Sequence, residues 1–283
     1  NKSISAFISA NNDNIKLTSE MNGLTRDEIR KLEPMFGSFD DKILSYLPSN
    51  PLMLMSMSID WGHQHKYLSD LLSNSSFGND PSYKTQIQPA ILGFKPFFEA
   101  FGDEFVIVLE DIELVGQERT PYPMITFATS ITSVEHIEGL LQMIFQNKLM
   151  GYNGDYYTHF DNLGKIYIVY NDSYLLITNN QKTYQAFNDG GYAMSLKDSE
   201  LASKISSHPV FEYVNLDFSS YNSELYYLIK QALVENRIDP SKLGIFHSLE
   251  ASAESITNGS FKLNLKRSPG NSLFNIFSLL DNF

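Results

Sequence analysis

The chain has 283 residues, enough for one large domain or two smaller ones with a substantial core. Its 21 Lys and Arg residues stand against 33 Asp and Glu residues, a formal net charge of −12 that disfavours nucleic acid as a partner. Cysteine is absent, which excludes disulfides, thiolate metal sites and a cysteine nucleophile in this chain. Charged residues make up only 19%. The surface is therefore expected to be rich in Asn, Ser and Tyr.

The composition and the N-terminal sequence suggest a location. No stretch approaches the roughly 18 uninterrupted apolar residues of a membrane-spanning helix. The first residues lack the basic-then-apolar pattern of a signal peptide, and no initiator Met precedes Asn1. We expect that residues ahead of Asn1 have been removed, and that the protein is extracytoplasmic, in a bacterial cell envelope.

An internal repeat is the first organisational signal. The segment Ser5–Thr18 matches Ala251–Asn264 at a constant offset, with Lys16 aligned on Lys262. Both segments are typical of a hairpin, and Asn258-Gly259 predicts the turn of the second one. The chain is thus predicted to begin in the closing hairpin of a preceding repeat unit.

The remaining elements follow in chain order. Thr25 with Glu28 predicts a capped helix, and Thr132 with Glu135 predicts another. Strands are predicted where apolar residues alternate or run together, and helices where they recur every three or four residues. The other predicted elements are a short amphipathic stretch at Ile43–Leu47, a strand at Pro51–Ile59 with one strongly apolar Met face, a helix at His65–Leu72, a fully buried strand at Phe105–Leu109 after a turn at Gly102-Asp103, a strand at Met124–Ile131, a hairpin at Lys165–Thr178, a helix at Tyr184–Phe187 ending in Gly190-Gly191, a strand at Phe211–Phe218, a helix at Ser223–Val234, a turn at Asp239-Pro240, a hairpin at Phe246–Lys266 and a helix at Leu273–Leu280.

This order predicts an α+β fold, with antiparallel or mixed sheets built from repeated strand-helix-hairpin units and helices packed on one face. Two regions follow from the repeat. Residues 1–50 would be the closing hairpin and helices of a preceding unit, and residues 51–283 the main repeat body, with two subunits split near 150–190 as one arrangement.

Three stretches carry a resemblance to a known family. They are SYLPSNPLMLMSMSIDWGHQHKYLSDLL (Ser45–Leu72), GFKPFFEAFGDEFVIVLEDI (Gly93–Ile112) and GKIYIVYNDSYLLITNNQ (Gly164–Gln181). Together they resemble a Bacteroidetes envelope lipoprotein family, the domain of unknown function 4836, over most of Ser45–Lys266. The resemblance implies a lipid anchor on an N-terminal Cys that this chain lacks, and a further unit upstream. It implies no catalytic or ligand residue.

One histidine pair has metal-like spacing. His63 and His65 follow Asp60, and in an extended segment both imidazoles would project to one side and could share Zn²⁺ with that carboxylate. On a helix the two rings would diverge. Because the helix at His65–Leu72 begins here, the structural interpretation is favoured, and no cofactor is expected.

Carboxylates and aromatic residues give the other candidates. Asp103, Glu104, Glu110, Asp111 and Glu113 flank the Phe105–Leu109 strand, where we favour a turn and a solvated strand exit over a glycosidase pair. Exposed aromatics beside Asn and Asp can stack on sugar rings. The candidates for such stacking are Trp61 and the loop residues Tyr152, Tyr156 and Tyr157.

Three functions remain open. The first, which we favour, is a non-enzymatic envelope protein that binds or scaffolds a protein or glycan partner through its sheet, with contact to the membrane only through a lipid anchor outside this chain. The second is a carbohydrate-binding module that uses exposed Tyr and Trp. The third is an extracytoplasmic hydrolase without a recognisable motif, since no nucleophile elbow, P-loop or dinucleotide-binding fingerprint is present.

Overall fold

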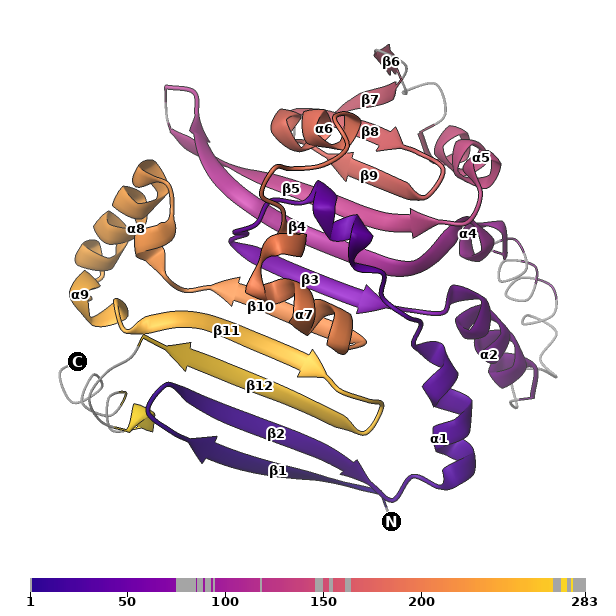
Figure 1. Cartoon of the computed structure of the whole chain (residues 1–283), viewed down its shortest axis with the longest axis horizontal. Coiled ribbons are helices and arrows are strands. Elements are labelled where there is room, and N and C mark those ends of the chain that lie inside the picture. Colours follow the sequence, from indigo (N-terminus) through magenta and orange to yellow (C-terminus); the bar gives the residue numbers. More distant parts are fainter. Residues whose placement is uncertain are drawn as a thin grey trace.

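One antiparallel sheet organises the molecule (Figure 1). The computed structural model describes residues 2–74, 95–117, 119–145, 150–152, 155–160, 164–266 and 271–273, with single positions 85, 89, 93 and 276. The 12 strands follow the order β1-β2-β12-β11-β10-β3-β4-β5-β9-β8-β7-β6. They are β1 (Ser3–Ala10), β2 (Asn14–Asn22), β3 (Met53–Ser58), β4 (Phe101–Val115), β5 (Thr120–Ile131), β6 (Met150–Tyr152), β7 (Asp155–Phe160), β8 (Gly164–Tyr170), β9 (Tyr174–Thr178), β10 (Val210–Asn215), β11 (Phe246–Ala253) and β12 (Asn258–Leu265).

Helices connect the strands and surround the sheet. The described helices are α1 (Arg26–Leu32), α2 (Trp61–Asn74), α4 (Lys95–Ala100), α5 (Val134–Phe145), α6 (Gln181–Asn188), α7 (Glu200–Ser207), α8 (Ser223–Glu235) and α9 (Pro240–Leu243). Short 3₁₀ turns are η1 (Glu33–Met35), η2 (Asp41–Tyr46), η6 (Leu196–Asp198) and η7 (Phe218–Ser220). The coarse expectation of a mixed helix and sheet protein is therefore confirmed. The strand-helix-hairpin repeat is not confirmed and stays a prediction.

The main core lies on one face of the central strands. Helices α6 and α7 pack over this face together with η2 (Figure 1). The core joins residues of η2, the inward side of the strands and the two helices, and its members include Ile43, Leu44, Leu47, Leu54, Val106, Val108, Leu176, Phe187, Ile205 and Phe211. Residues 1–50 thus share the sheet, through β1 and β2, and the core, through η2, with the rest of the chain. The assignment of residues 1–50 to a preceding repeat unit stays a prediction.

A second, smaller core lies on the opposite face. Alternate residues of β8 enter different clusters, with Tyr167 and Val169 in the main core and Ile168 in the second. Because side chains alternate along a strand, the two clusters lie on opposite faces of β8. Helix α5 covers the second cluster with Ile137 and Leu141. Helices therefore cover both faces at β8, so packing on one face is not a general property of this sheet.

Several local predictions are confirmed. Thr25 and Glu28 form a reciprocal capping box at the start of α1. The hairpin at Lys165–Thr178 is present as β8 and β9, and both similar segments form hairpins. Helix α6 ends at Asn188, and Gly190 and Gly191 follow it with φ angles of 90° and 130°, a backbone conformation that would be strained for a residue with a side chain. The predicted helix at Leu273–Leu280 lies mostly outside the described residues.

The predictions for the region around β4 were wrong in two respects. Gly102 and Asp103 lie inside β4 rather than in a turn, at a register shift against β5. A Cβ atom on Gly102 would lie 2.3 Å from Ser130 Oγ, so glycine here permits a close approach of two strands. The segment Phe105–Leu109 is also not fully buried, because only Val106 and Val108 face the main core.

Three further local predictions were wrong. Asn258 and Gly259 lie in β12, paired with Glu20 and Ser19 of β2, and the turn precedes them. Ser133 rather than Thr132 accepts from the first turn of α5, through the backbone N–H of His136 at 3.4 Å. The expected loop containing Tyr152, Tyr156 and Tyr157 is the hairpin β6–β7, because aromatic residues favour strands.

Candidate functional site

A continuous row of apolar residues crosses the sheet on the face opposite the main core. Paired residues of antiparallel strands project to the same face, so the registers define the row. In order across the sheet it runs Ile8, Leu17, Phe261, Ala251, Glu212, Met55, Ile107, Phe127, Ile177 and Ile168. Only one member of this row, Glu212, is charged.

Two parallel rows extend this surface. One consists entirely of apolar residues and runs Ala10, Ile15, Leu263, Leu249, Val214, Met53, Leu109 and Ile125. The other runs Ala6, Ser19, Gly259, Ala253, Val210, Met57, Phe105, Thr129 and Leu175. We call the surface made by the three rows from β1 to β5 the open face.

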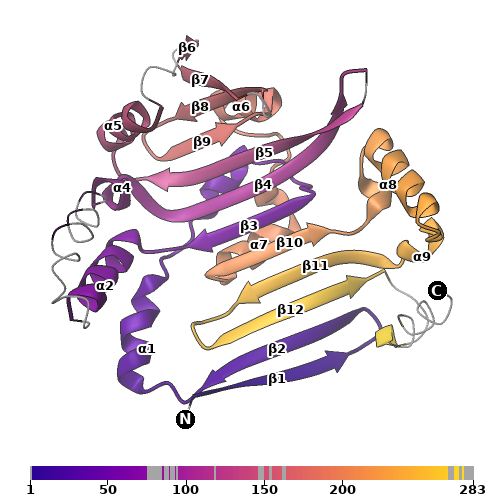
Figure 2. The same cartoon turned by 180° about the vertical axis from the view of Figure 1, so that it is seen from behind.

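Much of the open face is exposed. Ile8 is 72% exposed, Phe261 42% and Met53 46%, whereas Ile168 at the α5 end is fully buried. Seen from behind in Figure 2, no described helix crosses β10, β11, β12 or β2, while α2, α4 and α5 stand at one end of the strands and α8 at the other. Soluble proteins rarely leave a large contiguous apolar surface uncovered, so such a surface marks a site of interaction.

Which face of β3 is buried explains why the sequence alone did not reveal this surface. The sequence predicts that β3 has one strongly apolar Met face, but the face buried in the main core is the opposite one, with Leu54 at 3% and Ser56 at 0% exposure. Ser56 Oγ donates to the carbonyl of Phe211 at 3.3 Å, which satisfies it inside the core. The alternation itself was the usable signal, but it could not tell which face is covered by helices.

Glu212 lies near the middle of the open face. Its neighbours across the strands are Met55 and Ala251, and its neighbours along the face in β10 are Val210 and Val214. It makes no ion pair or side-chain hydrogen bond with the described part of the chain. The carboxylate is therefore free to meet a cation brought by a partner.

A shallow groove of about 290 Å³ passes beside Glu212. Its floor and walls come from four strands, and its lining includes Leu17, Val210, Glu212, Ala251, Ala253 and Phe261. Three small residues leave room for the hollow: Ala251, Ala253 and Gly259. Ala253 is paired with Gly259, and Ala251 is paired with the larger Phe261. The groove gives the open face a place where a projecting side chain can enter.

The candidate metal residues Asp60, His63 and His65 have other contacts in the structure. Both histidines lie on helix α2, which begins at Trp61 rather than at the predicted His65. Asp60 accepts a hydrogen bond from the His63 backbone N–H at 2.7 Å, and the His65 ring lies 5.1 Å from that of Phe98. In the described part of the chain no group of three or more His, Asp or Glu side chains is arranged to hold a metal ion.

The aromatic candidates do not gather into one site. Trp61 is half-buried at the start of α2, with its ring centroid 6.0 Å from that of Phe98 in α4. The backbones of Tyr152, Tyr156 and Tyr157 lie in β6 and β7, at the far edge of the sheet. Their side chains lie outside what the structure describes.

The expectation of a solvated strand exit was wrong for Glu110, which is the most enclosed carboxylate that the structure describes, with 8% exposure. Burial raises its pKa, against the hydrogen bonds donated by Thr126, Thr183 and Asn180. The distances are 2.6 Å from both Thr183 Oγ1 and Asn180 Nδ2. These donors tie β4 to β5 and α6, so we assign the group to the fold rather than to a reaction.

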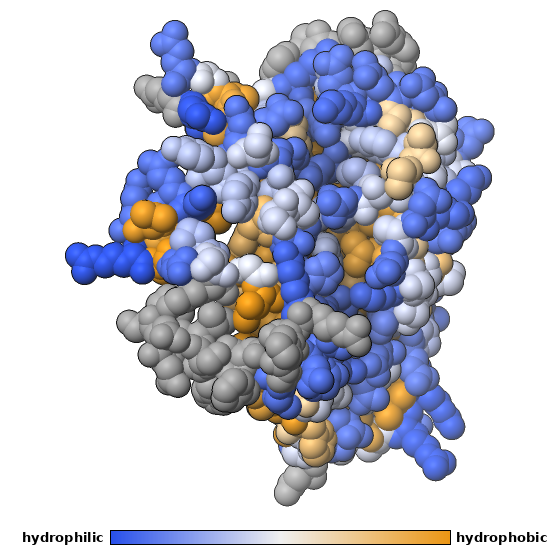
Figure 3. Space-filling model, turned by 60° about the vertical axis from the view of Figure 1, so that its left-hand side comes forward, coloured by the Kyte–Doolittle hydropathy of each residue, from blue (hydrophilic) through white to orange (hydrophobic). Residues whose placement is uncertain are grey.

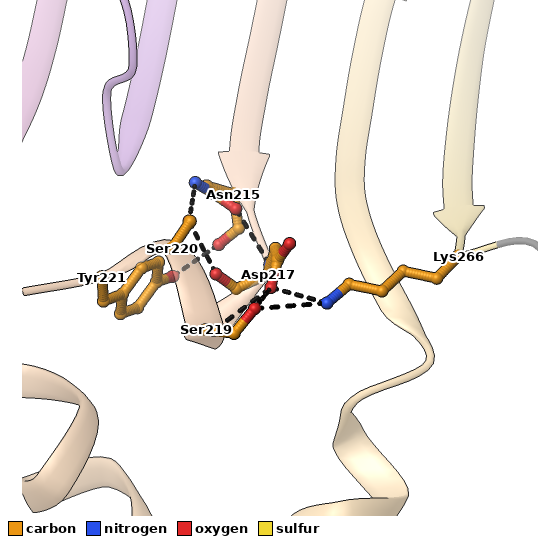
Figure 4. A network of polar contacts seen from close by, with 6 residues as sticks. All are labelled: Asn215, Asp217, Ser219, Ser220, Tyr221 and Lys266. Atoms are coloured by element: carbon orange, nitrogen blue, oxygen red, sulfur yellow. Dashed lines mark hydrogen bonds and ion pairs between the residues drawn. The ribbon is translucent and has the colours of Figure 1, made fainter.

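A second carboxylate network closes the end of β10 (Figure 4). Asp217 accepts from Lys266 Nζ at 2.7 Å and from the Ser219 backbone N–H at 3.1 Å. Burial opposes its ionisation, but the hydrogen bonds from Lys266 and Ser219 hold the pKa of Asp217 below its usual value. Tyr221 OH donates to the carbonyl of Asn215 at 2.5 Å in the same network.

This network forms one wall of a pocket of about 370 Å³ under α8 and α9. Phe218, Tyr226, Ile229 and Leu233 supply apolar lining. From the side of these helices, Figure 3 shows separate hydrophobic patches among mostly hydrophilic residues. Because Asp217 and Lys266 already satisfy each other, the pocket offers no free charge from this pair.

No helix in the described residues has the length and apolarity to span a membrane.

No protein-family model matches the chain, and no curated protein does. A solved structure titled "Structure of crystal form I of TP0453" is similar at 8% identity and a TM-score of 0.40, covering 85% of this chain and 97% of that one. A similarity of this level carries no functional argument.

Proposed function

We propose that this chain is a non-enzymatic binding protein of the cell envelope, whose open face holds an amphipathic, basic segment of a partner protein. The observation that supports it is the uncovered apolar surface of three rows with one unpaired carboxylate. Apolar burial would supply the affinity, and Glu212 would set the register of the partner. The envelope location is part of the proposal and depends on the Asn- and Ser-rich, weakly charged composition.

The charge of the open face selects among occupants. An acyl chain brings no cation, so binding it would bury Glu212 without a partner, which is costly. A second copy that used the same face would bring no cation either, since the three rows contain neither Lys nor Arg. A helix or strand with apolar residues and one Lys or Arg satisfies both the surface and the carboxylate.

The test uses a short amphipathic peptide of Leu and Lys, labelled with a fluorophore, and the corresponding peptide of Leu and Glu. Fluorescence anisotropy should show binding of the Lys peptide only. Glu212→Gln should weaken binding by about three- to tenfold, the usual range for one ion pair that is partly desolvated.

The matched control is Glu20→Gln, which removes the same charge from an exposed residue of β2 on the other face of the sheet. It should leave binding within about twofold, because a distant exposed charge is screened by salt. Equal losses from Glu212→Gln and Glu20→Gln would show general attraction to an acidic protein, and the proposal would then fail.

A further inference from the structure

A second candidate site lies away from the open face, in a cleft of about 540 Å³ between α1 and α2. Arg30 and Lys31 come from the last turn of α1. The contribution of α2 is a stripe of residues spaced one helical turn apart, and so on one face of the helix. These residues are His63, Lys66, Tyr67, Asp70 and Leu71.

Hydrogen bonds fix the two walls relative to each other. His63 Nε2 lies 3.3 Å from the carbonyl oxygen of Lys31, which requires the proton on Nε2 for a hydrogen bond. The Asp60 carboxylate accepts from the His63 backbone N–H at 2.7 Å, and the Asp60 backbone N–H donates to the Met35 carbonyl at 3.0 Å. The cleft is therefore a built feature at the junction of α1, η1 and α2.

The charge of the cleft is opposite to that of the protein. Its lining holds three cations, Arg30, Lys31 and Lys66, against one carboxylate, Asp70. The chain as a whole has 33 acidic and 21 basic residues. Within the described part of the chain Lys31 and Lys66 make no ion pair, and Arg30 reaches only Asp27, at 3.8 Å between exposed groups. Elsewhere Lys204 and Lys266 bind carboxylates directly, at 2.8 and 2.7 Å.

Helix electrostatics account for only part of this cluster. Cations at the C-terminal end of α1 complement its dipole, which explains Arg30 and Lys31. Lys66 lies inside α2, beyond its first turn, where the dipole has little effect. Its position in the lining with Arg30 and Lys31 places three positive charges around one cleft, and an anion held between them would lower their mutual repulsion.

We propose that the α1–α2 cleft binds a phosphate-bearing ligand. A phosphate group offers several acceptor oxygens, which suit the point charges of Lys31 and Lys66 and the planar donors of Arg30. Inorganic phosphate, a soluble phosphomonoester and a phospholipid headgroup share this chemistry. The site is independent of the open face, since a basic peptide would be repelled here.

Titration calorimetry of the whole chain with inorganic phosphate tests the site. The cleft variant carries Lys31→Gln and Lys66→Gln, and the matched control carries Lys42→Gln and Lys182→Gln, two exposed lysines on other elements. We expect the cleft variant to lose at least about tenfold in affinity, and the control to stay within about twofold. Both variants remove the same net charge.

Vesicle sedimentation distinguishes the sources of the phosphate group. Phosphatidylcholine vesicles with and without phosphatidic acid are compared for the wild type and both variants. Binding to phosphatidic acid that is lost only in the cleft variant supports a headgroup, and calorimetric binding without vesicle binding supports a soluble phosphate. The proposal is overturned when neither ligand binds, when both variants lose affinity equally, or when sulfate binds as tightly as phosphate.

Discussion

Glu212 of β10 is paired with Met55 of β3, so a carboxylate without a partner in the described part of the chain stands beside a methionine, on a region of the sheet that no described helix crosses. The pairing continues on both sides into apolar residues, Ala251 in β11 and Ile107 in β4. Where one face of an antiparallel sheet is buried and the other faces solvent, residues along each strand normally alternate between apolar on the buried face and polar on the solvent face. The arrangement is instead what an interaction surface requires, with apolar area for affinity and one charge for orientation.

Neighbouring residues of β3 should differ sharply in their effect on stability. Leu54 is 3% exposed in the main core and Met53 is 46% exposed on the open face. Leu54→Ala should lower the free energy of unfolding by about 2–4 kcal/mol, because it leaves a cavity. Met53→Ala should cost about 1 kcal/mol or less. Urea unfolding followed by circular dichroism measures both, and equal costs would mean that both faces of β3 are buried.

Adjacent residues of β1 provide a test of the open face as a binding surface. Ile8 projects onto the open face and Phe7 onto the other, and they are 72% and 62% exposed. Ile8→Ser should weaken binding of the Leu and Lys peptide by about three- to tenfold, because apolar area is lost from the contact. Phe7→Ser should leave it unchanged. A larger effect from Phe7→Ser in the anisotropy assay would place the peptide on the face opposite the open face and contradict the proposal.

Glu110 should give the protein a measurable pH dependence. Its pKa is raised mainly by burial, so the folded state binds a proton more readily than the unfolded state. This contribution to stability is present below the unfolded-state pKa and is lost as the pH rises through the folded-state value. The free energy of unfolding of the wild type should therefore increase relative to Glu110→Gln as the pH falls from about 7 to about 5.

The measurement for Glu110 is urea unfolding of both proteins at the two pH values. The difference between them isolates this group from the other titrating residues, since only Glu110 is changed. A difference that does not move with pH, or that moves toward the variant on acidification, would contradict the raised pKa.

Gly102 and Ser130 should behave as a coupled pair. A Cβ atom on Gly102 would lie 2.3 Å from Ser130 Oγ and 2.9 Å from Ser130 Cβ. Gly102→Ala should therefore destabilise the protein by about 1–3 kcal/mol, as overpacking usually does. Replacing Ser130 by Gly in the same chain should recover part of that loss, and thermal unfolding of the two single variants and the double variant measures the coupling. Strict additivity would show that the clash is relieved elsewhere.

Local sequence signals located most elements. The alternating residues of β3 and β5, the reciprocal cap of Thr25 and Glu28, and the glycine pair after α6 each depend on neighbours in the chain. Such signals fail where a distant segment decides the outcome. Gly102 was predicted to lie in a turn, but it lies within β4, where a glycine leaves room for the close approach of Ser130 in β5.

The candidate sites show the same division. The sequence by itself determined that β3 has a Met face and a Leu/Ser face, that a helix runs through His65–Leu72, and that the chain is acidic and free of cysteine. Only the tertiary structure decided that α6, α7 and η2 cover the Leu/Ser face, leaving the Met face open, and that α1 approaches α2 to bring Lys31 near Lys66. The physical reason is that period and capping are local, whereas the choice of which face is buried depends on contacts between segments far apart in the chain.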